Sequence, residues 1–137
     1  MNFLILTITL FIFACIPLED TDSLYVDYVI DGDTFVIEDG RIIRVWGIDA
    51  PEKDQPYYQT ATLTLESFIE DELLECIFIA KGKYRRDLMR CYVGDNDIGA
   101  LMVEKGMAKN YGEFPNDYYL SEEITAQQKK RGIWSEK

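Results

Sequence analysis

The dipeptide Asp39-Gly40, set between two β-prone runs, places the strongest constraint on the first half of the fold. The run before it covers Thr34 to Glu38, and the run after it covers Arg41 to Ile48. Asp-Gly in this position predicts a β-hairpin, because both central residues of a type I′ turn need a positive φ. Leu24 to Ile30 is rich in Tyr and Val and predicts another strand. Three consecutive strands are therefore expected.

A helix is predicted between Pro56 and Asp71, where the apolar residues change to helical spacing. Two further strands follow, at Leu73 to Ala80 and at Asp87 to Val93. The apolar face of the helix is expected to hold Ala61, Leu65, Phe68 and Ile69.

Two short helices are predicted at the end of the chain. The first is marked by Ile98, Leu101 and Met102, with Gly106 at its C-cap. The inner face of the second is expected to hold Leu120, Ile124 and Gln127 to Gln128, and Gly132 ends it. The order β-β-β-α-β-β-α-α fits a small closed barrel better than a parallel βαβ sheet.

The N-terminal residues 1–16 predict export. Phe3 to Ile16 carries no charge and is too short to span a bilayer comfortably, so it fits a signal peptide. The alternatives are a lipoprotein signal, in which Cys15 becomes lipidated, and an uncleaved membrane anchor. Residues 17–23 are interpreted as a linker and 24–137 as one domain, taken to be a monomer. The protein is expected to be secreted, periplasmic or lipid-anchored at the cell surface.

Cys76 and Cys91 both fall in predicted strands. They form a disulfide if the strands are neighbours in an oxidising compartment, and two buried thiols otherwise. The chain has no histidine, which excludes catalytic triads, zinc–histidine sites and imidazole bases. Its net charge of −11 argues, taken alone, against a polyanionic partner.

Two segments gather carboxylates beside an arginine. The first is Asp31-Gly32-Asp33-Thr34, and the second runs from Arg44 to Glu52 with Asp49 and Pro51 inside it. In an extended chain, Asp31 and Asp33 point the same way. If the hairpin brings Asp33 near Asp49, the two carboxylates can share one hard cation, which prefers oxygen ligands. Each segment alone is also compatible with an ordinary turn.

A third segment, residues 81–90, holds five basic side chains in an otherwise acidic protein. Arginine matches a phosphate bidentately, and Tyr84 offers a flat ring for a base or a donor for a phosphate. The alternative is a solvated basic loop.

Asp-Gly-Asp-Thr, Arg-x-x-x-Ile-Asp-x-Pro-Glu and Tyr-x-Arg occur here in one order. Together they resemble the staphylococcal nuclease (thermonuclease) family over roughly Leu24 to Trp134, including Gly106 to Lys109 and Gly132 to Trp134. The resemblance implies an α+β fold, namely a five-stranded OB-fold β-barrel with three helices. It also implies a calcium-dependent nuclease that hydrolyses phosphodiester bonds of DNA or RNA.

The resemblance further implies a role for each matching residue. Asp33, Asp49 and the Ala50 carbonyl would bind Ca²⁺. Asp31 would not bind the ion itself but would hold a water molecule that does. Arg44 and Arg86 would grip the scissile phosphate, and Glu52 would orient or deprotonate the attacking water. The residues expected to contact the nucleotide or its phosphate are Lys83, Tyr84 and Tyr111.

The chain departs from the family pattern at Ala50, which replaces a threonine, and at Arg85, which replaces a glycine. Two other functions stay open. One is a non-catalytic OB-fold module that binds nucleic acid or a protein. The other is a structural lipoprotein whose acidic surface binds cations.

Overall fold

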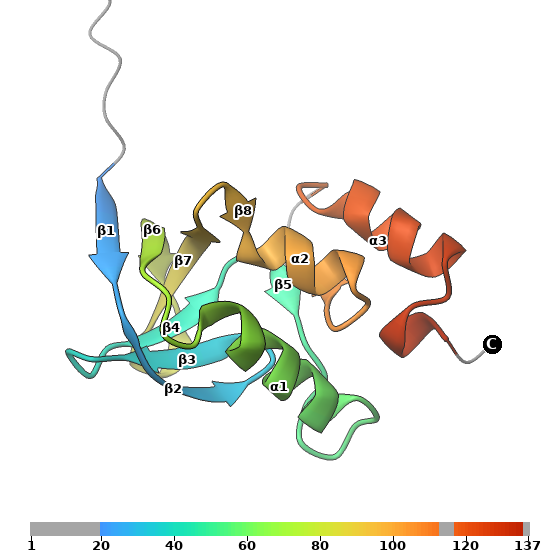
Figure 1. The fold of residues 1–137 in the computed structure, drawn as a ribbon, viewed down its shortest axis with the longest axis horizontal. Helices are drawn as coiled ribbons and strands as arrows, with labels where there is room; N and C mark the ends of the chain where they lie inside the picture. The colour runs from blue at the N-terminus through green and yellow to red at the C-terminus, as the bar shows by residue number, and fades with distance from the viewer. Residues whose placement is uncertain (1–19, 113–116, 136–137) are drawn as a thin grey trace, which may run out of the picture.

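The computed structural model describes residues 20–112 and 117–135, which form a curved mixed sheet with helices packed against it (Figure 1). The strands are β1 Thr21–Leu24, β2 Val26–Asp31, β3 Thr34–Ile37, β4 Ile42–Val45, β5 Ile48–Asp49, β6 Leu74–Lys81, β7 Arg86–Val93, β8 Asn96–Asp97 and β9 Lys109–Asn110. The helices are α1 Tyr58–Ile69, α2 Ile98–Glu104 and α3 Leu120–Gln128, with 3₁₀ turns at Lys83–Arg85 and Gly132–Trp134.

The main sheet has the strand order β1-β6-β7-β4-β3-β2, with β8 added to β7. Only Tyr25 separates β1 from β2, so the two act as one long strand that pairs with β6 through its first part and with β3 through its second. The chain itself therefore joins the two ends of the path and closes a five-stranded ring. The predicted α+β fold with a small barrel and three helices is confirmed.

The predicted hairpin around Asp39-Gly40 is present between β3 and β4, but the predicted turn type is wrong. The Ile37 amide bonds to the Arg41 carbonyl at 3.1 Å, which leaves a loop of three residues rather than two. Gly40 has a φ of 86°, whereas Asp39 does not have a positive φ. A three-residue hairpin loop needs glycine only at its last position, where the chain enters the left-handed region.

Helix α1 packs on the barrel through the face that its spacing predicts. Ala61, Leu65 and Ile69 are fully buried, and Phe68 packs against them from the edge of the core. The strands contribute the rest of the core, which includes Phe35, Ile43, Val45, Leu74, Met89 and Cys91.

The predicted inner face of α3 is wrong. Leu120 and Ile124 are 38% and 44% exposed, and the helix instead buries Ala126. A polar contact determines this orientation of the helix, because Glu123 accepts a hydrogen bond from the Asn110 amide of β9 at 3.1 Å. This contact turns an acidic side of the helix inward.

Strand β1 begins at Thr21, inside the segment interpreted as a linker. Its pairing with β6 is supported by Ser23, whose hydroxyl donates to Glu75 at 2.9 Å. The expected signal peptide, Cys15 and residues 17–19 lie outside the described residues. In the part of the chain that the structure describes, no helix is long and apolar enough to cross a membrane.

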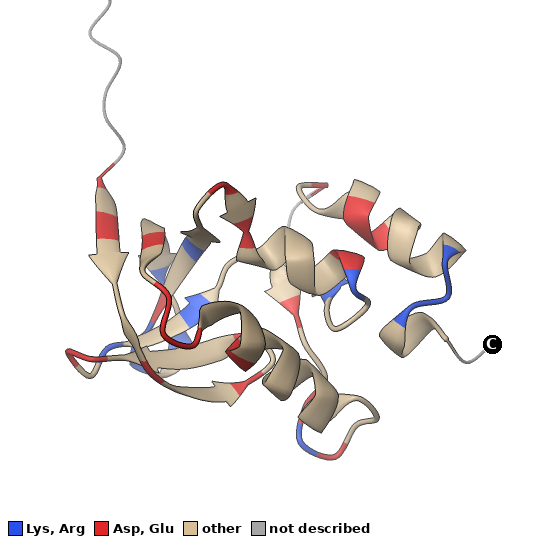
Figure 2. Cartoon of the chain, viewed as in Figure 1, with Lys and Arg blue, Asp and Glu red and all other residues tan. Residues whose placement is uncertain are grey.

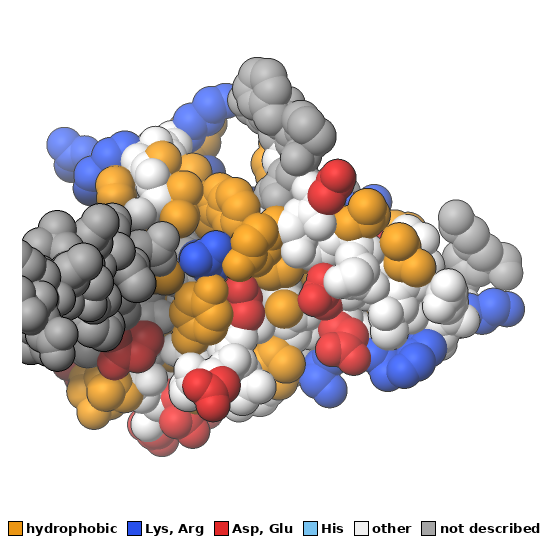
Figure 3. Space-filling view, turned by 90° about the horizontal axis from the view of Figure 1, so that it is seen from above, with side chains coloured by type: hydrophobic (Ala, Val, Ile, Leu, Met, Phe, Trp, Pro, Cys, Tyr) orange, Lys and Arg blue, Asp and Glu red, His pale blue; other side chains and the backbone are white. Residues whose placement is uncertain are grey.

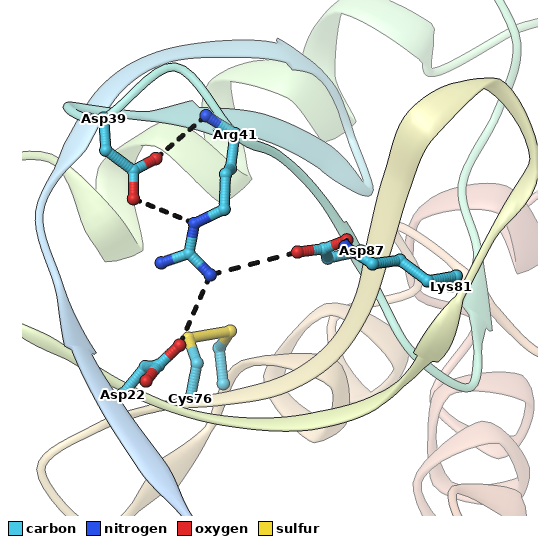
Figure 4. A network of polar contacts seen from close by, with 7 residues as sticks. Asp22, Asp39, Arg41, Cys76, Lys81 and Asp87 are labelled. Atoms are coloured by element: carbon cyan, nitrogen blue, oxygen red, sulfur yellow. Dashed lines mark hydrogen bonds and ion pairs between the residues drawn. A yellow bond between two sulfur atoms is a disulfide. The ribbon is translucent and has the colours of Figure 1, made fainter.

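Cys76 and Cys91 are cross-strand partners on β6 and β7 and form a disulfide, which answers the question that the sequence left open. Figure 4 shows this bond beside a charged network centred on Arg41. The guanidinium of Arg41 contacts Asp39 at 2.8 Å, Asp22 at 3.3 Å and Asp87 at 3.9 Å. The network joins the β3–β4 hairpin to β1 and to the start of β7.

Candidate active site

Asp31 and Asp33 flank a tight turn, because Asp31 pairs with Thr34 across β2 and β3. The expectation that they align in an extended chain is therefore wrong. Instead, the Asp31 carboxylate accepts a hydrogen bond from the Asp33 amide at 3.1 Å, which closes the turn. Gly32 is needed for close approach, since a Cβ there would lie 2.7 Å from that of Ala50 and 2.8 Å from that of Ala61.

The Asp33 carboxylate is buried and held by several donors. It accepts from the Ala50 amide at 2.8 Å and from the Thr34 hydroxyl at 2.9 Å, and it lies 3.2 Å from Arg44. Burial nevertheless dominates and raises the pKa of Asp33 to about 7, with the nearby Asp31 adding to the rise. Arg44 and the Ala50 amide oppose this shift without cancelling it.

Arg44 brings Asp33 and Asp49 together. The same guanidinium nitrogen lies 3.2 Å from Asp33 and 3.5 Å from Asp49. The other terminal nitrogen donates to the Ile48 carbonyl at 2.8 Å and to the Val45 carbonyl at 3.1 Å. With both ends held, the arginine has a defined position at the end of β4, between two carboxylates that are far apart in sequence.

A cavity of about 680 Å³ opens beside this group. Arg86 enters it from β7 and Lys83 from the preceding turn, so both face the same space as Arg44 and Asp49. Tyr111 also lines the cavity, because its amide bonds to the Gly47 carbonyl at 2.9 Å. Four cationic side chains, those of Arg44, Lys81, Lys83 and Arg86, thus line the cavity together with Asp49, and Asp33 lies beside it through its contact with Arg44.

Asp49 also lines a second cavity, of about 570 Å³. That cavity contains Ala50, Tyr57, Lys109 and Trp134. Asp49 therefore stands where the two cavities meet, and an extended ligand that crosses Asp49 has room in both directions.

Arg86 takes its position from the residues around it. Its Nε donates to the Lys83 carbonyl at 3.2 Å, and its guanidinium lies 5.5 Å from the centre of the Tyr84 ring. The next residue, Asp87, is buried and paired with Lys81 at 2.5 Å. Figure 4 shows how Asp87 lies between Lys81 and Arg41, which holds the start of β7 from both sides.

Two predicted site residues lie apart from this group. Glu52 is exposed, and its carboxylate makes no hydrogen bond or ion pair with the residues that the structure describes. Tyr84 is 83% exposed, and among the described residues it meets the site through its contact with Arg86. Its φ of 59° and the φ of 60° at Arg85 show that the turn uses the left-handed region twice without glycine.

The residues present fit a hard divalent cation. Within residues 20–112 and 117–135, no group of three or more acidic or other metal-binding side chains converges. Asp33 and Asp49 do converge, and they offer the carboxylate oxygens that Ca²⁺ prefers. The raised pKa of Asp33 marks a buried carboxylate that Arg44 neutralises incompletely, so a further positive charge would be stabilised there.

The sequence interpretation assigned no role to Trp46, which also lines the larger cavity. A partial signal was available, since Trp46 lies two residues after Arg44 in the run that was predicted as a strand, although β4 itself ends at Val45. The role of Lys81, which pairs with Asp87, could not be found in this way because the pairing depends on the β6–β7 register.

The distribution of charge accounts for an acidic protein with a basic site. Figure 2 shows acidic residues at the β3–β4 hairpin, in the turn before β8 and on α3. Arg44 lies on β4, and Arg86 and Arg90 lie on β7. The net charge of −11 therefore does not describe the local charge of the cavity.

Residues 42–136 match the family described as staphylococcal nuclease homologue. An uncharacterized endonuclease of Escherichia coli O157:H7 is 34% identical over 79% of this chain and 74% of its own length. A thermonuclease of Staphylococcus intermedius is 33% identical over 82% of this chain and 76% of its own. An uncharacterized endonuclease of Haemophilus influenzae is 30% identical over 97% and 79%. From these matches and its fold, the chain belongs to the staphylococcal nuclease family.

Proposed function

We propose that the protein is a calcium-dependent nuclease that hydrolyses phosphodiester bonds of DNA or RNA at the cavity beside Asp49. One observation carries this proposal: Arg44 pairs with both Asp33 and Asp49, and Arg86 enters the same cavity from another strand. The family to which the chain belongs consists of staphylococcal nuclease homologues, and relatives named endonuclease or thermonuclease support the same reaction.

The arginines provide the charge that the reaction needs. A phosphodiester is anionic and gains further charge on its oxygens as water adds to phosphorus, so catalysis depends on preorganised positive groups. Arg44 and Arg86 would bind the phosphate oxygens from two sides of the cavity, and Lys83 would bind an adjoining phosphate. Ca²⁺ at Asp33, Asp49 and the Ala50 carbonyl would supply additional positive charge against the same phosphate.

Glu52 would act on the attacking water, a role that rests on its place in the Ile-Asp-Ala-Pro-Glu segment, since its side chain is exposed and lies apart from Arg44 and Asp33 in the structure. Pro51 is buried directly before it and restricts the backbone from which Glu52 projects. Asp31 lies beside the Asp33 turn and would order water next to the ion. In the hydrolysis the bond to the leaving oxygen breaks, and that oxygen takes up a proton.

A cleavage assay tests the proposal. The full chain is incubated with single-stranded DNA and with RNA, in Ca²⁺ or in excess chelator. We expect chelator-sensitive cleavage that falls about 10²- to 10³-fold in Arg86→Ala, because a preorganised donor to the transition state is lost. Glu52→Gln should fall in kcat with little change in KM.

The matched control is Lys129→Ala, which removes a positive charge at the exposed end of α3. Its activity should equal that of the parent. Nucleic acid binding without cleavage would instead identify a non-catalytic module of this fold, and cleavage that persists in chelator would exclude the calcium dependence.

We also propose that the chain is exported. The Cys76–Cys91 disulfide supports this, because such bonds persist mainly in oxidising compartments. Mass spectrometry of the protein from its source cell should show an N-terminus beyond residue 14, with a lipid on Cys15 if the signal is of the lipoprotein kind. An intact N-terminus carrying reduced cysteines would contradict export.

A further inference from the structure

The second cavity begins at Asp49, the residue that also lines the larger cavity. Its volume of about 570 Å³ is comparable with the 680 Å³ of the larger one. Arg44, Lys83 and Arg86 line the larger cavity and do not line the second. A strand cut beside Asp49 has a nucleotide on each side of the scissile phosphate. If one of them lies in the larger cavity, the second cavity is available to the other.

Contacts within the protein hold the walls of the second cavity in place. On one side is the loop before α1, where the Glu52 amide donates to the side-chain oxygen of Gln55 at 2.8 Å. On the other side is the 3₁₀ turn at Gly132–Trp134. The two sides are joined by a hydrogen bond of 2.5 Å between the hydroxyls of Tyr57 and Ser135. The cavity is therefore formed before any ligand binds.

Lys109 brings a positive charge to this cavity. It is the direct partner of Asp49 in the antiparallel pairing of β5 with β9, so the two side chains project from the same face. Its ammonium lies 5.7 Å from the centre of the Trp134 ring. Within residues 20–112 and 117–135 this ammonium forms no ion pair, so its charge can attract an anionic ligand.

The other residues that line the second cavity suit a nucleoside. Pro51, Pro56, Tyr57 and Trp134 provide apolar and aromatic surface, which is typical of sites that bind a small organic group. Among the described residues that line it, Asp49 supplies the single carboxylate. The cavity therefore combines flat apolar walls with one lysine, a combination that binds a base and sugar together with a phosphate.

The surface elsewhere is less favourable to a strand. Figure 3 shows one face of the molecule, on which acidic side chains lie between the basic ones. A phosphate on that face is repelled as well as attracted. Because contacts between lysine or arginine and phosphate supply much of the affinity for nucleic acid, a lysine next to the cleavage position has a large effect on an acidic protein.

We propose that the second cavity, here called the Lys109 subsite, binds the nucleotide on the opposite side of the scissile phosphate from Lys83. The inference rests on the proposed nuclease function and adds a determinant of substrate binding. The base and sugar lie against Pro51, Pro56 and Tyr57, and the next phosphate pairs with Lys109. Lys83 and Lys109 then bind the two phosphates that adjoin the scissile one.

The test uses two dinucleotides of equal composition and charge, one with its terminal phosphate at the 5′ end and one with it at the 3′ end. We expect Lys109→Met to raise KM for one isomer roughly 5- to 50-fold, the loss of one charge-assisted contact, and to leave the other unchanged. Lys83→Met should show the reverse pattern. The unaffected isomer also demonstrates that each variant is folded.

Two further variants separate this role from a structural one. Lys109→Arg keeps the charge and should stay close to the parent with both isomers. Lys105→Met removes an exposed lysine just after α2 and should affect neither. An equal effect of Lys109→Met on both isomers would show that the lysine acts on Asp49 or its ion, and would overturn the subsite. No effect, or the same isomer preference as Lys83→Met, would also overturn it.

A binding measurement distinguishes failure of the subsite from failure of the nuclease proposal. In Trp46→Phe, Trp134 is the remaining tryptophan, and its ring lies beside Lys109. In chelator, its fluorescence should change more with one isomer than with the other. If the parent cleaves neither isomer in Ca²⁺, the nuclease proposal fails, whereas a fluorescence change that Lys109→Met weakens still supports the subsite. No change, or the same change with both isomers, overturns the subsite.

Discussion

Asp33 shows how one side chain in the site is stabilised and destabilised at once. It is 5% exposed and has three hydrogen-bonding or ionic partners, yet burial raises its pKa to about 7. The unfavourable state is therefore the charged one. A carboxylate in this condition gains from an additional cation, which supports the proposal of an ion at Asp33 rather than at the exposed Asp39.

The raised pKa of Asp33 predicts how stability changes with pH in chelator. Between about pH 4 and pH 7, the folded protein holds a proton that the unfolded chain has released, because the ordinary pKa of the group is 3.8. The free energy of unfolding should therefore fall as the pH rises through this window, by at most about 1.4 kcal/mol per pH unit from this group. Urea denaturation at several pH values measures the slope.

Asp33→Asn is the control for this experiment, because an amide does not titrate. The variant should retain only the pH dependence that the other acidic residues cause. An identical slope in the parent and the variant would show that Asp33 ionises normally in the folded state.

At the scale of elements, the connection between β6 and β7 determines where Arg86 points. The turn at Lys83–Arg85 is short, and β7 begins at once with Arg86. Asp87, paired with Lys81 and Arg41, holds the start of the strand. Tyr84 and Arg85 both adopt the left-handed backbone conformation although neither is glycine, and Arg85 stands where the family pattern has one. This conformation has an energetic cost for residues with a Cβ.

Arg85→Gly should relieve this cost. The left-handed conformation costs a residue with a Cβ roughly 1–2 kcal/mol of stability, and glycine avoids this cost. Part of the gain is offset because glycine has a larger conformational entropy in the unfolded chain. We expect the free energy of unfolding to rise by up to about 1 kcal/mol in chemical denaturation. Arg85→Ala removes the same charge but keeps the Cβ, so it should show no gain. A gain shared equally by both variants would assign the effect to charge.

At the scale of the whole molecule, an acidic body surrounds a small basic site. Four basic side chains line the cavity and can meet phosphates there: Arg44, Lys81, Lys83 and Arg86. The rest of the surface repels the same ligand, and added salt screens this repulsion as well as the attraction. Affinity for single-stranded nucleic acid should therefore depend only weakly on salt.

The prediction is a shallow plot of log affinity against log salt concentration, measured in chelator with an inactive variant such as Glu52→Gln. For single strands the slope is about −0.7 per neutralised phosphate, so its magnitude should stay within about 3. A markedly steeper slope would show that more phosphates are bound than these four side chains account for.

Features determined by neighbouring residues, such as single helix faces and hairpins, were predicted from the sequence. The buried face of α1 follows from helical spacing at Ala61, Leu65 and Ile69, and the β3–β4 hairpin follows from Asp39-Gly40. The three carboxylate and arginine segments came from motifs, and the structure places Arg44, Asp33 and Asp49 together.

Contacts between distant segments were not accessible in the same way. The orientation of α3 depends on Glu123 meeting the Asn110 amide, and the place of Trp46 depends on the parallel pairing of β4 with β7. The turn at Asp33 also differs from expectation, since its carboxylates converge through a hydrogen-bonded reversal of the chain. For α3 and Trp46 the deciding interaction joins segments that are far apart in the sequence, whereas at Asp33 it is a local turn that a spacing of two residues does not distinguish from an extended strand.

The Cys76–Cys91 bond means that the properties of a purified sample depend on where the chain was made. The bond spans 15 residues and includes the turn that presents Lys83 and Arg86, so it constrains that turn even in the unfolded chain. A preparation from a thiol-rich cytosol would have the same β6–β7 register but lack a crosslink worth about 3 kcal/mol for a loop of this length. Heat resistance would then report the redox history of the preparation as much as its amino-acid sequence.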